Sequence, residues 1–316
     1  MLFTRARAIS AAAVNNGSVN LPHAPLVHSG RSKPTNNGLM TTEPVSPVLT
    51  MNDGQAIPQL GLGVYKIADE QAADVVQTAI DAGYRHVDTA TLYGNEAGVG
   101  EGMRRSGVPR EELFVTTKLW QDDHGFDNTL RAFEESRQKL GLDYVDLYLI
   151  HWPAPKRGLY VETWRALEKL RSDGVVRSIG VSNFHTHHLD ALLAETEVVP
   201  VINQVELHPW LPQREVRAYC DVNGILTEAW SPLARGRVLG NPVLDTLAAK
   251  HSVSPAQVVI RWHLQQGIVV IPKSVTPDRI RQNADVFGFE LDDDDLAAID
   301  GLESGERTGL DPDDNN

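Results

Sequence analysis

Hydrophobic residues along this chain alternate between two patterns from residue 62 onward. Short continuous apolar runs are typical of strands buried on both faces, whereas apolar residues that repeat every three or four positions are typical of helices. The continuous runs predict eight strands, at 62–65, 84–88, 113–117, 144–150, 175–181, 201–205, 225–229 and 268–271. The helical pattern predicts helices at 70–82, 95–105, 128–140, 161–172, 188–195, 214–222, 245–251, 255–266 and 279–287.

This alternation of strand and helix predicts the fold class. Strands that each lead into a helix form a parallel sheet covered by helices. Eight such units favour an α/β structure of the (β/α)8 TIM-barrel type over an open doubly wound sheet. The chain also lacks the G-x-G-x-x-G and Walker A phosphate signatures that open sheets often carry. Two apolar segments around Asn52-Asp53-Gly54 predict an N-terminal β-hairpin, which we expect to close the bottom of the barrel.

The first 45 residues differ from the rest of the chain. They are rich in Ala, Ser, Asn, Thr and Pro and show no sustained hydrophobic period. We expect residues 1–45 to be a disordered N-terminal extension and residues 46–316 to be a single barrel domain. An Arg- and Ser-bearing transit peptide is the alternative for the first residues. Translation that begins at Met40 is a further hypothesis, which the N-terminal mass of natively expressed protein would test.

Charge and cysteine content restrict the partners. The formal net charge is −13, which disfavours nucleic acid because phosphate binding needs clustered Lys and Arg. Cys220 is the only cysteine, so no internal disulfide forms and a reducing compartment is compatible. No apolar run approaches 18 residues. We therefore expect a cytoplasmic protein, a monomer, that binds neither membrane nor nucleic acid.

Four reactive side chains stand at or just beyond predicted strand ends. They are Asp88, Tyr93, Lys118 and His151. The carboxyl ends of barrel strands converge on one face, where barrel enzymes do their chemistry. A buried amine needs a counter-charge, and Asp88 is the natural partner of Lys118. The cation would in turn lower the pKa of Tyr93 and make it a proton donor, while His151 would orient a carbonyl oxygen. This set predicts a hydride-transferring carbonyl reductase.

Several motifs in this order resemble those of the aldo-keto reductases over residues 46–300. They are Gly83-Tyr84-Arg85-His86-Val87-Asp88-Thr89-Ala90 with Tyr93-Gly94-Asn95-Glu96, His151-Trp152-Pro153, Gly180-Val181-Ser182-Asn183-Phe184, Asn203-Gln204-Val205-Glu206-Leu207-His208-Pro209, and Ile271-Pro272-Lys273-Ser274. Many relatives have Tyr at the position of Trp230. A Trp there is similar to the bacterial 2,5-diketo-D-gluconate reductase branch and to some prostaglandin F synthases.

The resemblance implies a cofactor and the residues that bind it. It implies NADPH/NADP+ bound without a Rossmann fold, with Asp88, Tyr93, Lys118 and His151 as the catalytic set and Tyr93 as general acid. The implied contacts to the nicotinamide come from Ser182, Asn183, Gln204 and Trp230, and Ser231 and Leu233 are also implied to bind the cofactor. Those to the adenosine 2′-phosphate and adenine come from Lys273, Ser274, Arg279, Gln282 and Asn283, although Gln282 replaces an acidic residue common in relatives.

The sequence constrains the identity of the substrate less than that of the cofactor. Tyr65, Trp120 and Trp152, with Trp230, predict an aromatic pocket wall, completed by loops 152–159 and 231–240 and by the chain after Gly301. Small aldehydes, α-dicarbonyl compounds and keto-sugar acids all remain open, as does the role of Arg235 and Arg237.

Two alternatives belong to other classes. Lys118 would form a Schiff base in an aldolase or decarboxylase, but only if it were uncharged. A non-catalytic NADP(H)-binding interaction module is the second. No metal site is predicted, because His185, His187 and His188 lack a recognised ligand spacing.

Overall fold

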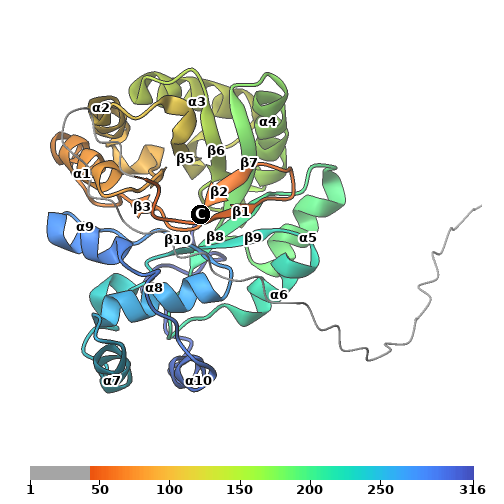
Figure 1. Ribbon diagram of the computed structural model, residues 1–316. Coiled ribbons are helices and arrows are strands. Elements are labelled where there is room, and N and C mark those ends of the chain that lie inside the picture. The colour runs from red at the N-terminus through yellow and green to blue at the C-terminus, as the bar shows by residue number, and fades with distance from the viewer. Residues whose placement is uncertain (1–42) are drawn as a thin grey trace, which may run out of the picture. The chain divides into compact units, whose positions relative to one another are not determined.

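The strands form one parallel sheet in the order predicted. The computed structural model describes residues 43–316, and the expectations for residues 1–42, including the start at Met40, lie outside them. The sheet runs β10-β9-β8-β7-β6-β5-β4-β3 (Figure 1). Its strands are β3 (Leu62–Gly63), β4 (His86–Asp88), β5 (Phe114–Leu119), β6 (Val145–Ile150), β7 (Val176–Ser182), β8 (Ile202–Glu206), β9 (Leu226–Trp230) and β10 (Val269–Val270).

The sheet closes on itself between its first and last strands. Leu60 forms a parallel bridge with Val270, and the backbone N–H of Gly61 donates to Val270 O over 2.9 Å. Closure removes the free edges of the sheet, so the predicted (β/α)8 barrel is confirmed.

The predicted hairpin covers the end of the barrel where the strands begin. It consists of β1 (Val48–Thr50) and β2 (Ala56–Pro58), paired antiparallel. The Asn52 side chain donates to Pro200 O over 2.9 Å, just before β8, and Asp53 accepts from Ser178 Oγ over 2.8 Å. Met51 and Ile57 join a buried apolar cluster inside the barrel with Phe114, Leu147, Leu149, Val201, Ile202 and Val269.

Helices surround the sheet, and all except the last lie close to the predicted positions. They are α1 (Asp69–Asp81), α2 (Glu96–Ser106), α3 (Phe126–Leu140), α4 (Tyr160–Ser172), α5 (Thr186–Glu195), α6 (Arg214–Val222), α7 (Pro242–His251), α8 (Pro255–Gln265), α9 (Pro277–Ala284) and α10 (Asp293–Asp300). The larger hydrophobic core lies between these helices and the strands. At α10, Asp292 caps the first turn by accepting from Asp295 N over 2.9 Å, as expected for aspartates that open a helix.

Candidate active site

Local structure brings Asp88, Tyr93 and Lys118 together. Asp88 is the last residue of β4, Lys118 lies in the neighbouring strand β5, and Tyr93 ends a short 3-10 helix, η1 (Thr91–Tyr93). Lys118 Nζ lies 2.6 Å from Asp88 Oδ1, 2.9 Å from Thr89 O and 3.5 Å from Tyr93 Oη. The ammonium therefore has a carboxylate, a carbonyl and a phenol as neighbours.

Lys118 is fully buried, and its partners determine its charge. Burial alone lowers the pKa of an amine, but Asp88 and Tyr93 raise the pKa of Lys118 overall. The amine stays protonated, because an ion pair with good geometry offsets part of the desolvation cost.

Tyr93 differs from the sequence-based expectation. Lys118 does lower the pKa of the phenol, but burial raises it more and Asp88 adds to the increase, so the pKa of Tyr93 is about 12. The expectation of a lowered pKa was wrong, because it weighed the nearby cation and omitted desolvation. Tyr93 is consequently protonated near neutral pH.

His151 follows β6 and faces the same region. Its ring centroid lies 5.7 Å from that of Tyr93, edge-on, and 5.5 Å from that of Trp120. Burial, with Lys118 nearby, holds the pKa of His151 well below its usual range. The imidazole is therefore neutral, and its buried Nδ1 atom has no hydrogen-bond partner.

Gln204 joins this group to a carboxyl that sequence reasoning missed. Gln204 Nε2 donates to Asp88 Oδ2 over 2.8 Å and to Glu228 Oε2 over 2.9 Å. Burial and the charge of Asp88 raise the pKa of Glu228 to about 8. Glu228 also lies 3.8 Å from His86 Nε2. The only signal in the sequence was an acidic residue inside an otherwise apolar strand.

Ser182, Asn183 and Trp230 form a second hydrogen-bonded group beside Gln204. Ser182 Oγ donates to Gln204 O over 2.8 Å, and Trp230 Nε1 donates to Asn183 Oδ1 over 2.8 Å. Asn183 Nδ2 donates to His151 O over 2.9 Å. The oxygen and the nitrogen of the Asn183 side-chain amide thus both form hydrogen bonds within the protein. These bonds fix the half-buried Trp230 ring relative to His151.

The aromatic residues that were expected to line the pocket lie around these groups. The Tyr65 ring centroid is 5.0 Å from that of Tyr93, and Trp152 is 6.5 Å from both His151 and Trp230. Tyr65 is 42% exposed and Trp152 is buried. Tyr93 thus lies among aromatic rings.

Comparison with known proteins identifies the family. Residues 58–304 match the aldo/keto reductase family. Glyoxal reductase of Bacillus subtilis is 53% identical over 83% of this chain and 95% of its own length. Methylglyoxal reductase DkgA of Escherichia coli is 51% identical over 84% and 97%. A mutant of Gox0644, solved in complex with NADPH, is 50% identical, covers 86% of this chain and 99% of its own, and superposes with a TM-score of 0.83.

The chain belongs to the aldo-keto reductase family. It is accordingly an NADP-dependent oxidoreductase. No helix of residues 43–316 is long and apolar enough to cross a membrane.

The residues that the resemblance assigns to the cofactor's nicotinamide and its neighbourhood have side chains that suit it. With Gln204 Nε2 committed to two carboxyl groups, the Oε1 atom remains to accept a hydrogen bond from a carboxamide N–H. Trp230 offers an indole held in place through Nε1. Ser231 has a left-handed backbone with φ of 49°, and Leu233 is half-buried against the core.

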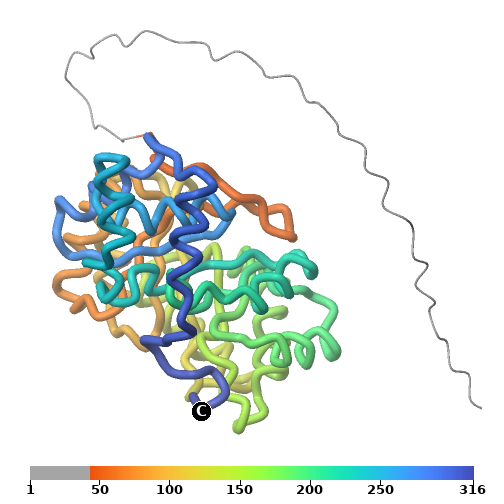
Figure 2. Tube along the Cα trace, turned by 90° about the horizontal axis from the view of Figure 1, so that it is seen from below, coloured from red at the N-terminus to blue at the C-terminus, as the bar shows by residue number. Residues whose placement is uncertain are grey.

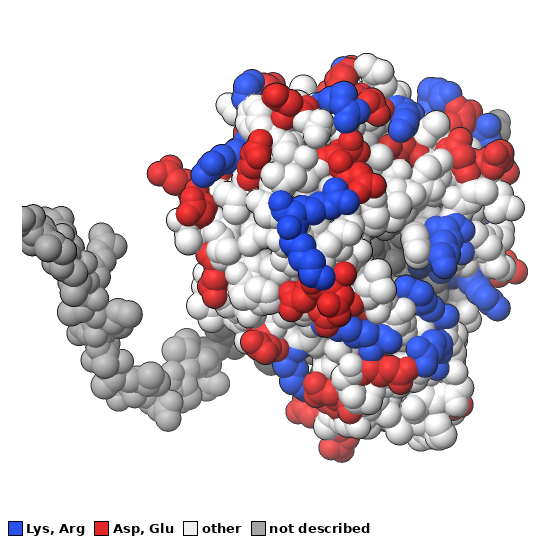
Figure 3. Space-filling model, turned by 180° about the vertical axis from the view of Figure 1, so that it is seen from behind, with Lys and Arg blue, Asp and Glu red and all other residues white. Residues whose placement is uncertain are grey.

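The residues that the resemblance assigns to the 2′-phosphate and adenine also suit those groups. Lys273 and Arg279 are exposed, and neither forms an ion pair with an acidic side chain within residues 43–316. Asp278 instead pairs with Arg281 at 3.2 Å. Ser274 and Asn283 are buried, and Gln282 is exposed. Acidic and basic side chains are interspersed on the face opposite that of Figure 1 (Figure 3), so the overall negative charge does not exclude an anion.

The C-terminal segment, which was expected to line the pocket, contacts Glu206 and Trp230. Glu206 at the end of β8 accepts from the backbone N–H groups of Thr308 and Gly309 over 2.6 and 3.0 Å. A Cβ on Gly309 would lie 2.5 Å from the Trp230 ring. The segment runs from α10 to the marked C-terminus (Figure 2). Arg237 pairs with Glu306 of this segment, whereas Arg235 is exposed.

Proposed function

We propose that this aldo-keto reductase reduces small aldehydes, α-dicarbonyl compounds or keto-sugar acids, with Tyr93 as the general acid. The contact of a charged, fully buried Lys118 with the Tyr93 phenol, 3.5 Å away, carries the proposal. The names of the glyoxal and methylglyoxal reductases that resemble this chain favour the α-dicarbonyl class.

The reaction requires a proton donor that is already protonated when hydride transfer begins. NADPH supplies the hydride when bound. Tyr93 is protonated because its pKa is about 12, and it can hand its proton to the developing alkoxide oxygen. The phenolate that results is stabilised by the Lys118 ammonium, whose own charge is held by Asp88. Such proton transfer contributes about 10²–10⁴-fold to enzyme rates.

His151 is suited to hold the substrate oxygen. A neutral imidazole has one N–H donor and one acceptor nitrogen, and the low pKa of His151 keeps it in that state. A hydrogen bond from this ring and another from Tyr93 would fix the carbonyl between them. The nearby aromatic rings would exclude water from the reacting atoms.

The alternatives have less support. A Schiff-base lyase needs an uncharged lysine, and the 2.6 Å contact with Asp88 favours the charged form of Lys118. A non-catalytic module would not need the Asp88–Lys118–Tyr93 arrangement.

The test is NADPH consumption with methylglyoxal, 4-nitrobenzaldehyde, a 2,5-diketo sugar acid and glucose as competing substrates. We expect kcat/KM to be highest for methylglyoxal or the nitrobenzaldehyde. No NADPH consumption with any of them would overturn the proposal, as would Schiff-base trapping of substrate on Lys118 by borohydride. The cytoplasmic location and monomeric state stay predictions, which cell fractionation and light scattering test.

A further inference from the structure

Glu206 is a buried carboxylate that the proposed chemistry does not use. It is the last residue of β8 and is 1% exposed. Its Oε1 atom accepts from His208 Nε2 over 3.0 Å, from Thr308 N over 2.6 Å and from Thr308 Oγ1 over 2.5 Å. Its Oε2 atom accepts from Gly309 N over 3.0 Å. Four donors therefore converge on one carboxylate, and three of them belong to the C-terminal segment.

These donors keep the Glu206 carboxylate ionised. Burial raises the pKa of this carboxyl, but hydrogen bonds from His208, Thr308 and Gly309 lower it more, so the pKa of Glu206 is about 2. Hydrogen bonds to an ionised acceptor are stronger than those between neutral groups. A buried charge that lost its donors would be costly. Glu206 thus holds the C-terminal segment through desolvated hydrogen bonds that depend on its charge.

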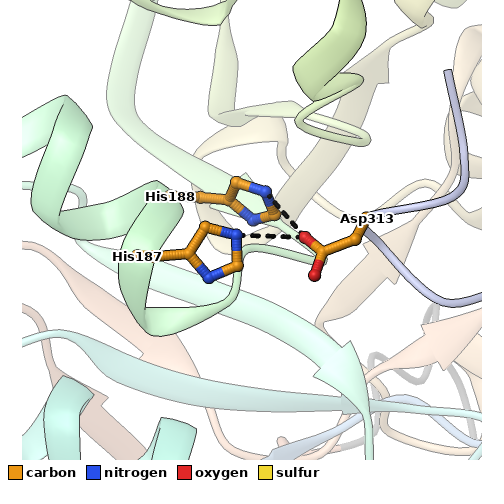
Figure 4. A group of neighbouring side chains, drawn as sticks. All are labelled: His187, His188 and Asp313. Atoms are coloured by element: carbon orange, nitrogen blue, oxygen red, sulfur yellow. Dashed lines mark hydrogen bonds and ion pairs between the residues drawn. The ribbon is translucent and has the colours of Figure 1, made fainter.

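The contacts further along the C-terminal segment are more exposed. His187 Nε2 lies 3.0 Å from Asp313 Oδ1, and both His187 and His188 point at that carboxylate (Figure 4). The His187 and Asp313 side chains are 60% and 51% exposed, and exposed ion pairs contribute little. We therefore expect Glu206, rather than these histidines, to fix the part of the segment that contacts Trp230.

Gly309 connects the anchored segment to the Trp230 ring. A Cβ added to Gly309 would lie 2.5 Å from Cη2 of Trp230 and 3.0 Å from Glu206 Oε2. Only a residue without a side chain fits between the carboxylate and the indole. Glu206 and Trp230 are also register partners on the adjacent strands β8 and β9. The indole Nε1 donates to Asn183 Oδ1 over 2.8 Å, so the ring is confined at both Nε1 and Cη2.

We propose that Glu206 is a positioning residue for the cofactor, because its carboxylate holds Gly309 against the indole and so fixes the tilt of the Trp230 ring on which the nicotinamide stacks. The effect on the cofactor rests on the proposed NADPH-dependent reduction. A misplacement of reacting groups by about 1 Å can cost about 100-fold in rate, so the tilt of this ring bears on hydride transfer. His208 supports the carboxylate through its own hydrogen bond.

Fluorine NMR of protein that contains 5-fluorotryptophan tests the position of the ring without cofactor or substrate. The chain has six tryptophans, and the Trp230 resonance is the one that disappears in Trp230→Phe. We expect this resonance to move by more than its linewidth in Glu206→Gln. Each oxygen of Glu206 faces an N–H group, and an amide nitrogen in either place cannot accept. The resonance should also move in Gly309→Ala, because the added Cβ displaces the ring.

Asp146→Asn is the matched control. Asp146 is likewise a buried carboxylate that accepts from a backbone N–H, that of Val115 over 2.9 Å, but it lies near the start of β6, at the hairpin end of the barrel. Glu206→Gln and Asp146→Asn should both lower the melting temperature, whereas only Glu206→Gln should move the Trp230 resonance. If Glu206→Gln does not fold, Thr308→Val removes one donor and should move the resonance, while Thr308→Ser keeps the hydroxyl and should not.

Equilibrium titration with NADPH is the second readout. The dissociation constant should rise at least about fivefold in Glu206→Gln and further in Trp230→Ala, because a displaced ring keeps part of its stacking. It should be unchanged in Asp146→Asn. A Trp230 resonance that stays in place in these variants of Glu206, Thr308 and Gly309, or that moves without a change in NADPH affinity, would overturn the proposal. The resonance of the apoprotein does not depend on turnover, so failure here is distinct from failure of the proposed reduction.

Discussion

Gln204 Nε2 lies 2.9 Å from Glu228 Oε2 in the interior of the barrel, where both side chains are buried. The same nitrogen donates to Asp88, the counter-ion of Lys118. Two carboxyl groups therefore share one amide, and a proton on Glu228 avoids a second buried negative charge. The pH dependence of folding should reveal that proton.

Glu228→Gln should change how stability depends on pH. Folding raises the pKa of Glu228 from 4.5 to about 8, so between these two values the folded state binds more protons than the unfolded state. The free energy of unfolding should consequently fall as pH rises from 5 to 8, with a slope of about 1.4 kcal/mol per pH unit from this one carboxyl. Urea unfolding of the apoenzyme at several pH values should show this slope in the wild type and a smaller slope in Glu228→Gln. Parallel slopes would mean that Glu228 is ionised throughout.

Tyr93→Phe should remove the proton donor without removing the ring. We expect kcat to fall by at least about 100-fold, the scale of general acid catalysis. The dissociation constant for NADPH should barely change, because Tyr93 is assigned to the substrate oxygen. Steady-state kinetics and a binding titration measure the two effects. Activity within threefold of wild type would contradict the assigned role.

Lys118→Met should abolish reduction and also destabilise the protein. Removing the amine leaves Asp88 buried without its ion-pair partner, which typically costs about 3–5 kcal/mol. The double variant Asp88→Asn/Lys118→Met should recover much of the stability but no activity. Urea unfolding and kinetics of Lys118→Met, Asp88→Asn and the double variant form the cycle. If the double variant regained activity, Lys118 would serve the fold alone.

Trp230→Ala should weaken NADPH binding. Stacking of aromatic side chains on nucleic-acid bases contributes about 1–3 kcal/mol, and we expect a similar loss here. The quenching of tryptophan fluorescence by added NADPH should also be smaller in the variant than in the wild type. A variant with unchanged affinity and quenching would place the nicotinamide elsewhere.

Arg279→Ala should weaken the binding of NADPH but not that of NADH. Charge-assisted hydrogen bonds contribute roughly 1.5–3 kcal/mol each, so the NADPH dissociation constant should rise at least tenfold. NADH binding should be nearly unchanged, because NADH lacks the 2′-phosphate. Arg281→Ala is the matched control, since Arg281 is already paired with Asp278. Equal losses for both cofactors would refute the assignment.

The sequence was sufficient to predict which side chains meet at the ends of the strands. Asp88 and Lys118 lie on adjacent strands, so a parallel barrel brings them together once the strands are recognised. The direction of the shift in the Tyr93 pKa could not be predicted from the sequence, because it depends on how completely the barrel excludes water.

Long-range contacts account for most of what the sequence did not predict. The contacts of Glu206 with Thr308 and of His187 with Asp313 join residues more than 100 positions apart. No local pattern encodes them, since each depends on the path of the chain after α10.

The hairpin at the opposite end of the barrel has a consequence for protein engineering. Asn52 and Asp53 contact the starts of neighbouring strands, whereas the C-terminal segment contacts Glu206 and Trp230 at the other ends of the strands. The hairpin that closes the barrel and the segments expected to select the substrate are therefore separate parts of the chain. Directed-evolution libraries confined to the pocket loops should yield a larger share of folded members than libraries of equal size spread over the hairpin and its contacts.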